Sequence, residues 1–90
     1  MNTLLVGYDL NKAGKNYEGL IEEIKKASTW WHHLDSTWLV KSDESSKEVR
    51  DRLKPYLDAD DELLVINVTG DAAAWAGFSD RGSKWLKENL

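Results

Sequence analysis

The chain contains no cysteine, which excludes disulfide bonds, thiolate metal sites and cysteine nucleophiles. A chain without cysteine fits a reducing compartment. Residues 1–10 have no basic segment and no long apolar run, so we expect no secretory signal peptide. The longest apolar stretch, residues 63–68, contains Asn67 and is too short to span a bilayer. We therefore expect a cytoplasmic protein without a membrane partner.

A glycine-rich phosphate loop is also missing. Gly70 and Gly77 are isolated, and Gly14-Lys15 lacks the upstream glycine of a P-loop, which argues against nucleotide hydrolysis. The formal net charge is −4, so the chain is acidic. An acidic surface repels phosphate backbones, and tight nonspecific binding to nucleic acid is disfavoured, although a local basic patch could exist.

The pattern of apolar residues predicts an alternation of strands and helices within one domain over residues 1–90. Ninety residues, of which 41% are hydrophobic, suffice for one core and are too few for two. Periodicity and composition predict a strand at 3–8, a helix at 17–27, a hairpin at 29–42 broken at 34–36, a helix from Ser45, a strand at 63–68 and a helix at 80–89. This β-α-β-β-α-β order with a helical tail predicts an α+β, ferredoxin-like sandwich with both crossover helices on one sheet face.

Local signals mark several boundaries of these elements. Asn16 is the expected N-cap of the first helix, and Ser45 with Glu48 matches a capping box for the second. Pro55 is expected to kink or end that second helix. The continuous aliphatic run at 63–68 is typical of a central strand, and residues 72–78 are expected to form one helical turn.

Asp9, at the end of the first predicted strand, is the first candidate site residue. A carboxylate there can hold Mg²⁺ through oxygen ligands. The alternative is that Asp9 caps the turn at residues 11–14, a common position for aspartate. His32 and His33 are adjacent on a strand and point to opposite faces, so they cannot both bind one metal ion. The acidic run that ends the second crossover is most simply interpreted as solvated loop charge; it comprises Asp58, Asp60, Asp61 and Glu62.

The five tryptophans are the second candidate feature, because tryptophan is enriched at protein interfaces. They are Trp30, Trp31, Trp38, Trp75 and Trp85. Trp30 and Trp31 must face opposite ways on a strand, so one of them leaves the side covered by the crossover helices. A homodimer could cover that open face, or the C-terminal segment with Trp75, Phe78 and Trp85 could fold back over it. Stacking of single-stranded bases on an exposed tryptophan is a further option, but the sequence shows no basic flanks.

The order of elements and one short motif resemble a known superfamily. Leu4-Leu5-Val6-Gly7-Tyr8-Asp9-Leu10, followed by a helix and by Ser36-Thr37-Trp38-Leu39-Val40 on a hairpin, resembles the small CRISPR-associated ferredoxin-fold nucleases and the related VapD toxins. In that superfamily the first strand commonly ends in an aromatic-Asp-hydrophobic triplet, here Tyr8-Asp9-Leu10. The resemblance implies a dimer in which two Asp9 residues face each other and position a metal-activated water for phosphodiester hydrolysis. Those CRISPR proteins, however, carry a C-terminal strand where this chain predicts a helix, and their surfaces are basic.

The whole chain is also similar to short bacterial proteins labelled "SinR family". The shared features are Tyr8-Asp9-Leu10-Asn11, Trp30-Trp31-His32, Leu34-Asp35-Ser36-Thr37-Trp38 and residues 75–78. The label names a helix-turn-helix repressor, and nothing in this sequence indicates a helix-turn-helix, so the label carries no functional weight. The sequence therefore favours a noncatalytic, dimeric protein-interaction module without a cofactor, and the resemblance implies a protein partner in a toxin, immunity or defence setting. The alternative is a Mg²⁺-dependent endoribonuclease that pairs Asp9 across a homodimer.

Overall fold

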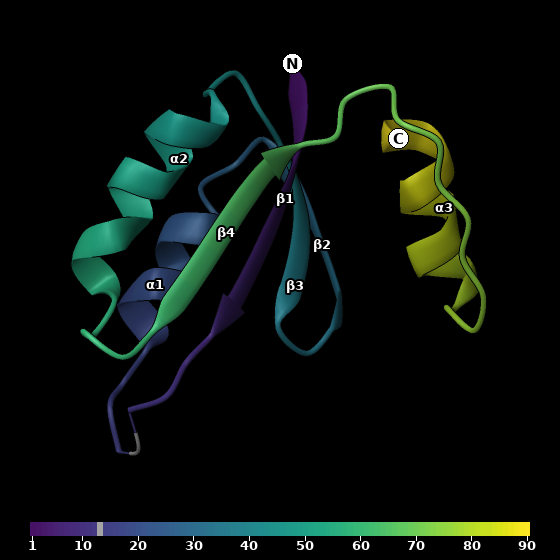
Figure 1. The fold of residues 1–90 in the computed structure, drawn as a ribbon. Helices are drawn as coiled ribbons and strands as arrows, with labels where there is room; N and C mark the ends of the chain where they lie inside the picture. The colour runs from purple at the N-terminus through teal and green to yellow at the C-terminus, as the bar shows by residue number, and fades with distance from the viewer. Residues whose placement is uncertain (13) are drawn as a thin grey trace.

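The computed structural model describes residues 1–12 and 14–90 and shows an α+β protein with one four-stranded antiparallel sheet (Figure 1). The elements are β1 (Asn2–Asp9), α1 (Glu18–Ile24), β2 (Thr29–Leu34), β3 (Thr37–Ser42), α2 (Ser46–Leu53), the 3-10 helix η1 (Lys54–Tyr56), β4 (Glu62–Asn67) and α3 (Asp80–Asn89). The predicted order of strands and helices is therefore present, including the C-terminal helix.

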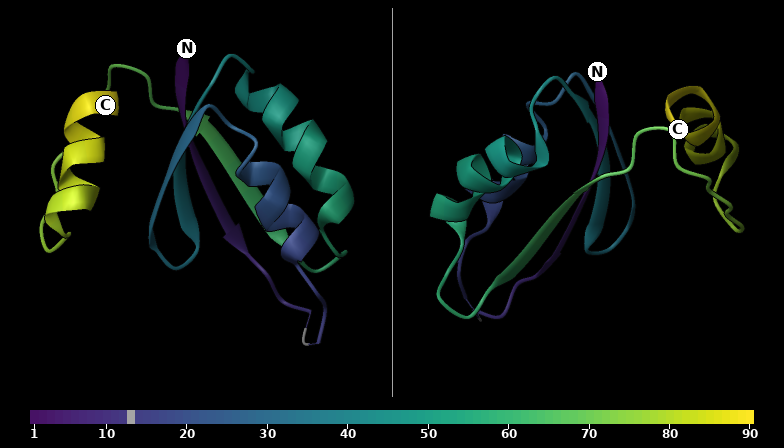
Figure 2. Two further views of the ribbon diagram at one scale, coloured as in Figure 1. Left: turned by 180° about the vertical axis from the view of Figure 1, so that it is seen from behind. Right: turned by 45° about the horizontal axis from the view of Figure 1, so that its top comes forward.

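The strand order in the sheet is β2-β3-β1-β4. Every neighbouring pair is antiparallel, so β1 runs in the same direction as β2, and β3 in the same direction as β4. Helices α1 and α2 connect these strands and lie together on one face of the sheet, as predicted (Figure 1). Helix α3 lies on the opposite face, which the two further views make clear (Figure 2).

A first hydrophobic cluster fills the space between the sheet and the helices α1 and α2. Alternate residues of β1 and β3 point into it, because side chains along a strand alternate between faces. The Trp38 indole Nε1 donates a hydrogen bond of 3.0 Å to the Tyr8 hydroxyl, so the largest side chain of this cluster is also paired. The buried members are Leu4, Val6, Leu20, Ile24, Trp38, Val40, Val49 and Leu53.

A second cluster lies on the other face, between β2, β3 and α3. Its buried members are Trp31, Leu39 and Leu86. The Trp31 indole Nε1 donates to the Gly82 carbonyl oxygen at 3.2 Å. A Cβ atom at Gly82 would lie 3.2 Å from the His33 ring, so the glycine permits the close approach of α3 to β2. The C-terminal segment therefore folds back over this part of the sheet, as one of the two alternatives above anticipated.

Most of the local signals are confirmed. The capping box is complete, since the Ser45 hydroxyl accepts from the Glu48 N–H and the Glu48 carboxylate accepts from the Ser45 N–H. Helix α2 ends at Leu53, two residues before Pro55. Asn16 does bind the start of α1 through its Oδ1, which accepts from the Glu18 N–H at 2.8 Å, although regular helix begins one residue later than predicted.

Three expectations about element boundaries and positions were wrong. Helix α1 ends at Ile24 and not at residue 27, because the N–H groups of Lys26 and Ala27 bond three residues back and tighten the last turn. Strand β4 is an edge strand and not a central one. Residues 72–78 form no helix; Gly77 has a φ of +87°, and the segment runs extended along α3 (Figure 1).

The two crossover helices are also joined by a polar network centred on Glu23 of α1. The Glu23 carboxylate accepts from Lys26 Nζ at 2.9 Å and from the Tyr56 hydroxyl at 3.0 Å. Arg52 of α2 bonds both Glu23, at 3.0 Å, and Glu44, at 2.9 Å. Hydrogen bonding from Lys26, followed by that from Tyr56 and Arg52, lowers the pKa of Glu23 from its ordinary value of 4.5 to about 2.

This network predicts a specific acid sensitivity. The folded-state pKa of Glu23 lies below its unfolded value, so its contribution to stability is complete above about pH 4.5 and is lost as the pH falls towards about 2. We expect Glu23→Gln to flatten the acid limb of stability in this window, as measured by urea unfolding at a series of pH values. The neighbouring Glu22→Gln is the control, because Glu22 is exposed and forms no ion pair with another described residue. Equal acid limbs in wild type and Glu23→Gln would contradict the assignment.

Candidate functional site

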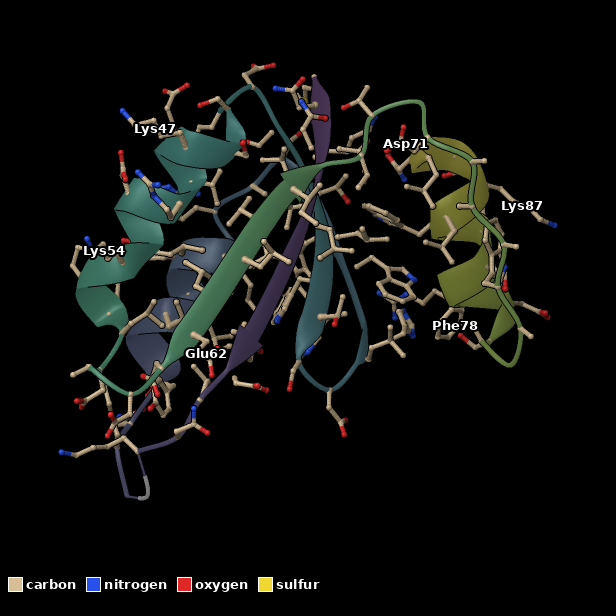
Figure 3. The ribbon with its side chains drawn as sticks, in the orientation of Figure 1. Lys47, Lys54, Glu62, Asp71, Phe78 and Lys87 are labelled. Carbon is tan, nitrogen blue, oxygen red and sulfur yellow. The ribbon has the colours of Figure 1, made fainter. Side chains whose placement is uncertain are left out.

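Asp9 lies exposed at the end of β1, directly opposite Glu62 at the start of β4. Residues opposite each other in an antiparallel pair share one face of the sheet, so the two carboxylates are neighbours on the face that also carries α3. Glu62 is labelled at this end of β4 in Figure 3. The Asp9 carboxylate forms no hydrogen bond or ion pair with another residue among 1–12 and 14–90. It sits beside a small surface hollow of about 360 Å³ that Glu62 and Ser36 also line.

Asp61, and not Asp9, organises the loop between β1 and α1. Its carboxylate accepts hydrogen bonds from the Asn11 N–H at 2.7 Å, from the Asp58 N–H at 2.7 Å and from the Tyr17 hydroxyl at 2.8 Å. Partial burial by itself would raise the pKa of Asp61, but the three donors together lower it below its usual value. The interpretation of Asp61 as solvated loop charge was therefore wrong.

The candidate metal ligands do not gather within one chain. Among the described residues, no three histidine or carboxylate side chains come together as a metal site would require. His32 stacks on Trp38 with ring centroids 3.7 Å apart, whereas His33 lies against Trp31 and Gly82 on the other face. The two histidines thus face opposite ways, as predicted. The carboxylates that the register brings opposite each other at this end of the sheet are Asp9 and Glu62.

The five tryptophans are divided between the two faces. Trp38 is buried in the first cluster and Trp31, only 3% exposed, in the second. Trp75 and Trp85 are half-buried around the second cluster, and the Trp85 indole Nε1 donates to Thr29 Oγ1 at 3.0 Å. Trp30 is the one tryptophan among the described residues that is classed as exposed, with 40% of its surface accessible.

The half of the sheet formed by β1 and β4 carries exposed apolar side chains on the face of α3. Leu64 is 56% exposed and Ile66 is 43% exposed, and both alternate with Leu63 and Val65, which face the helices α1 and α2. Gly7 lies opposite Leu64 and supplies no side chain to cover it. Helix α3 packs on β2 and contacts β1 through Thr3 and Leu5, but it does not cover Leu64 and Ile66 of β4. An apolar groove of about 440 Å³ lies beside it, between the sheet and residues 71–76.

Sequence reasoning missed Leu64 and Ile66 as surface residues, because it assigned the aliphatic run to a central strand. The signal that could have identified them was that the C-terminal segment predicts only one helix for this face of the sheet. One ten-residue helix is too narrow to cover four strands, since a helix with its side chains is about 10–12 Å wide and strands lie about 4.8 Å apart.

The unpaired Asp9 predicts a measurable effect on stability. Like charges directly opposite in a sheet are destabilising, so Asp9→Asn should raise the free energy of unfolding by about 0.5 kcal/mol at low salt. The gain should shrink at high salt, because screening weakens the repulsion from Glu62. Asp60→Asn is the control, as Asp60 is exposed and lies outside this pair. If Asp9→Asn lowered the stability instead, Asp9 would act as the turn cap.

Leu64 and Ile66 belong to a strand, and the helices α1, α2 and α3 are short. Within the described ranges, no helix combines the length and the apolar character that crossing a membrane requires. No model of a known protein family matches this sequence.

Proposed function

We propose that this protein is a noncatalytic interaction module on a ferredoxin-like scaffold, and that it forms a homodimer through the uncovered half of its sheet. The β-α-β-β-α-β order and the strand order β2-β3-β1-β4 support the ferredoxin-like assignment. The observation that carries the functional proposal is the exposure of Leu64 and Ile66 beside an apolar groove. Contiguous apolar surface of this kind marks interaction sites in monomeric folds.

A second copy of the chain suits this surface for a geometric reason. Two sheets packed face to face lie about 10 Å apart, which is close to the diameter of one helix. Helix α3 already occupies this layer over β2. With a two-fold axis parallel to the strands, α3 of each copy lies beside the β4 edge of the other, and the two uncovered halves meet. An axis across the strands would instead make α3 of each copy collide with β2 of the other.

The acidic end of the sheet argues for binding and not for catalysis. One chain supplies two adjacent carboxylates, Asp9 and Glu62, and no third histidine or carboxylate joins them among the described residues. Both histidines are engaged elsewhere, one on Trp38 and one against Gly82. This arrangement supports neither a general base nor a complete set of metal ligands within one chain.

The dimer is tested by its mass in solution. Sedimentation velocity over a wide range of protein concentration should show a dimer of the wild type. Ile66→Lys should give a monomer, because it would place an unpaired charge in the centre of a desolvated interface. The circular dichroism spectrum of this variant should equal that of the wild type, because Ile66 is already 43% exposed in one chain and the substitution should leave the fold intact.

The control places a larger change of charge on the far side of the molecule. Glu22→Lys lies on the exposed side of α1 and should leave the dimer intact. A wild type that stays monomeric at every concentration would rule out the homodimer. If Ile66→Lys and Glu22→Lys dissociated the dimer equally, the assignment of the interface to the uncovered half of the sheet would also be ruled out.

One observation favours a second candidate function, a metal-dependent endoribonuclease: Asp9 and Glu62 lie opposite each other at one end of the sheet. The axis parallel to the strands brings the same end of both sheets together, so Asp9 and Glu62 of one copy would lie near Asp9 and Glu62 of the other. Four carboxylates repel one another, and a divalent cation such as Mg²⁺, which prefers oxygen ligands, would relieve this repulsion. Asp9 and Glu62 of the two copies would then hold the ion, which can supply an activated water for phosphodiester cleavage.

Cleavage of RNA separates the two functions without depending on the dimer test. For an interaction module, mixed single-stranded and structured RNA should remain intact with Mg²⁺, and wild type and Asp9→Asn should behave alike. Cleavage that requires Mg²⁺, stops with EDTA and disappears in Asp9→Asn would establish the nuclease. Circular dichroism of the variant provides the folding control.

A further inference from the structure

A second surface feature lies on the other side of the molecule, along the free edge of β2. A groove of about 760 Å³ runs between this edge, α3 and the end of α1. Its volume falls within the range of small-molecule sites, roughly 300–1,000 Å³. The groove is remote from β4, the opposite edge of the sheet, so nothing inferred from it depends on the proposed dimer. Its lining includes Lys25, Trp30, His33, Arg81, Lys84 and Trp85.

One wall of the groove is a single face of α3. Residues at positions i, i+3, i+4 and i+7 of a helix share one face. Arg81, Lys84, Trp85 and Glu88 have this spacing, and all four line the groove. Lys87 does not line it; Figure 3 shows its side chain on the outer side of α3, pointing away from the sheet. Two cations of α3 are thus directed to the edge of β2.

The groove continues around the edge of β2 to the face of the crossover helices, where its lining is aromatic and carries a third cation. Trp30 is 40% exposed, and its ring lies against Trp38 with centroids 5.2 Å apart. The Lys25 Nζ lies 5.3 Å from the centroid of the Trp30 ring, so the cation is held at the indole by a cation–π contact. Trp38 is buried, and it fixes the position of the exposed indole.

The charge in this groove has the opposite sign to that of the whole chain. The groove gathers Lys25, Arg81 and Lys84 against one carboxylate, Glu88, whereas the net charge of the chain is −4. Glu88 lies 3.9 Å from Lys84 and partly neutralises it. Arg81 forms no hydrogen bond or ion pair with another residue in the described part of the chain. Its guanidinium is therefore free to bind an anion in the two-pronged geometry that suits phosphate.

We infer that this groove binds a nucleotide unit across the edge of β2, with the phosphate at Arg81 and the base stacked on the exposed face of the Trp30 indole, where it displaces the Lys25 ammonium. Arginine and lysine supply the phosphate contacts, and an exposed tryptophan supplies a stacking surface for any base. The combination of a free guanidinium, an exposed indole and a cation at that indole favours a phosphorylated aromatic ligand over a carboxylate-rich peptide, which has no use for the stacking surface. A free nucleotide and a single-stranded oligonucleotide present the same unit.

The experiment is a titration followed by ¹H–¹⁵N correlation NMR, in which each tryptophan contributes a resolvable indole N–H signal. Adenosine 5′-monophosphate should shift the Trp30 indole signal in a saturable manner at low salt. Adenosine and inorganic phosphate, each added alone, should bind at least about tenfold more weakly, because each supplies only one half of the contacts. A single-stranded oligoadenylate forms the second arm.

Matched variants locate the site. Arg81→Ala should weaken binding of adenosine 5′-monophosphate about tenfold, and Trp30→Leu should do the same. Lys84→Ala should weaken binding of the oligoadenylate and reduce the slope of its salt dependence by about one, whereas Lys87→Ala, on the outer side of the same helix, should not. Because Trp30 packs against Trp38, the exposed Arg81 and Lys84 keep the test valid if Trp30→Leu fails to fold.

The two arms identify the natural form of the ligand. Equal affinity for the mononucleotide and the oligonucleotide would assign a free nucleotide, and tighter, more salt-dependent binding of the oligonucleotide would assign a single strand; both support the groove. Three results would overturn it. They are no shift with either ligand, equal losses in Lys84→Ala and Lys87→Ala, or equal shifts of the Trp30 signal with an oligoglutamate peptide.

Discussion

The structure depends on one constraint, the alternation of apolar side chains on both faces of the two central strands. Leu4 and Val6 of β1 face the crossover helices, while Leu5 between them faces α3. On β3, Trp38 and Val40 face the crossover helices and Leu39 faces α3. A sheet with two apolar faces needs a layer on each side, since leaving either face in water forfeits the free energy of burial. The crossover helices supply one layer, and the residues after β4 supply part of the other.

The position of α3 explains both surface features. Three hydrogen bonds from side chains fix it over β2 and the start of β1: Trp31 to the Gly82 carbonyl, Trp85 to Thr29, and Thr3 to the Asn89 carbonyl at 2.9 Å. A helix held at β2 leaves β4 uncovered, which exposes Leu64 and Ile66. The same placement brings Arg81 and Lys84 to the free edge of β2 and builds the groove there. The apolar surface and the cationic groove thus both result from the position of α3 over β2.

Charge is arranged locally in a manner that the net value of −4 conceals. Two acidic side chains that connect elements of the fold accept several hydrogen bonds. Asp61 accepts from two backbone N–H groups and a tyrosine hydroxyl, and Glu23 accepts from a lysine, a tyrosine and an arginine. Asp9 has no such donors among the described residues and faces another carboxylate. A charge without compensation at the end of a strand contributes no stability, and for this reason Asp9 stays a candidate for function.

The sequence by itself determined the order of elements, their caps and the side of the sheet on which each strand residue lies. Local rules suffice for these features: the 45–48 capping box, the stop before Pro55 and the opposite orientation of Trp30 and Trp31 all follow from neighbours in the chain. The tertiary structure alone decided that β4 lies at an edge, that Asp61 and not Asp9 holds the first loop, and that Lys25 and the cations of α3 line one groove at the edge of β2. Each of these depends on contacts between residues far apart in the chain, for which a periodicity or a short motif holds no information.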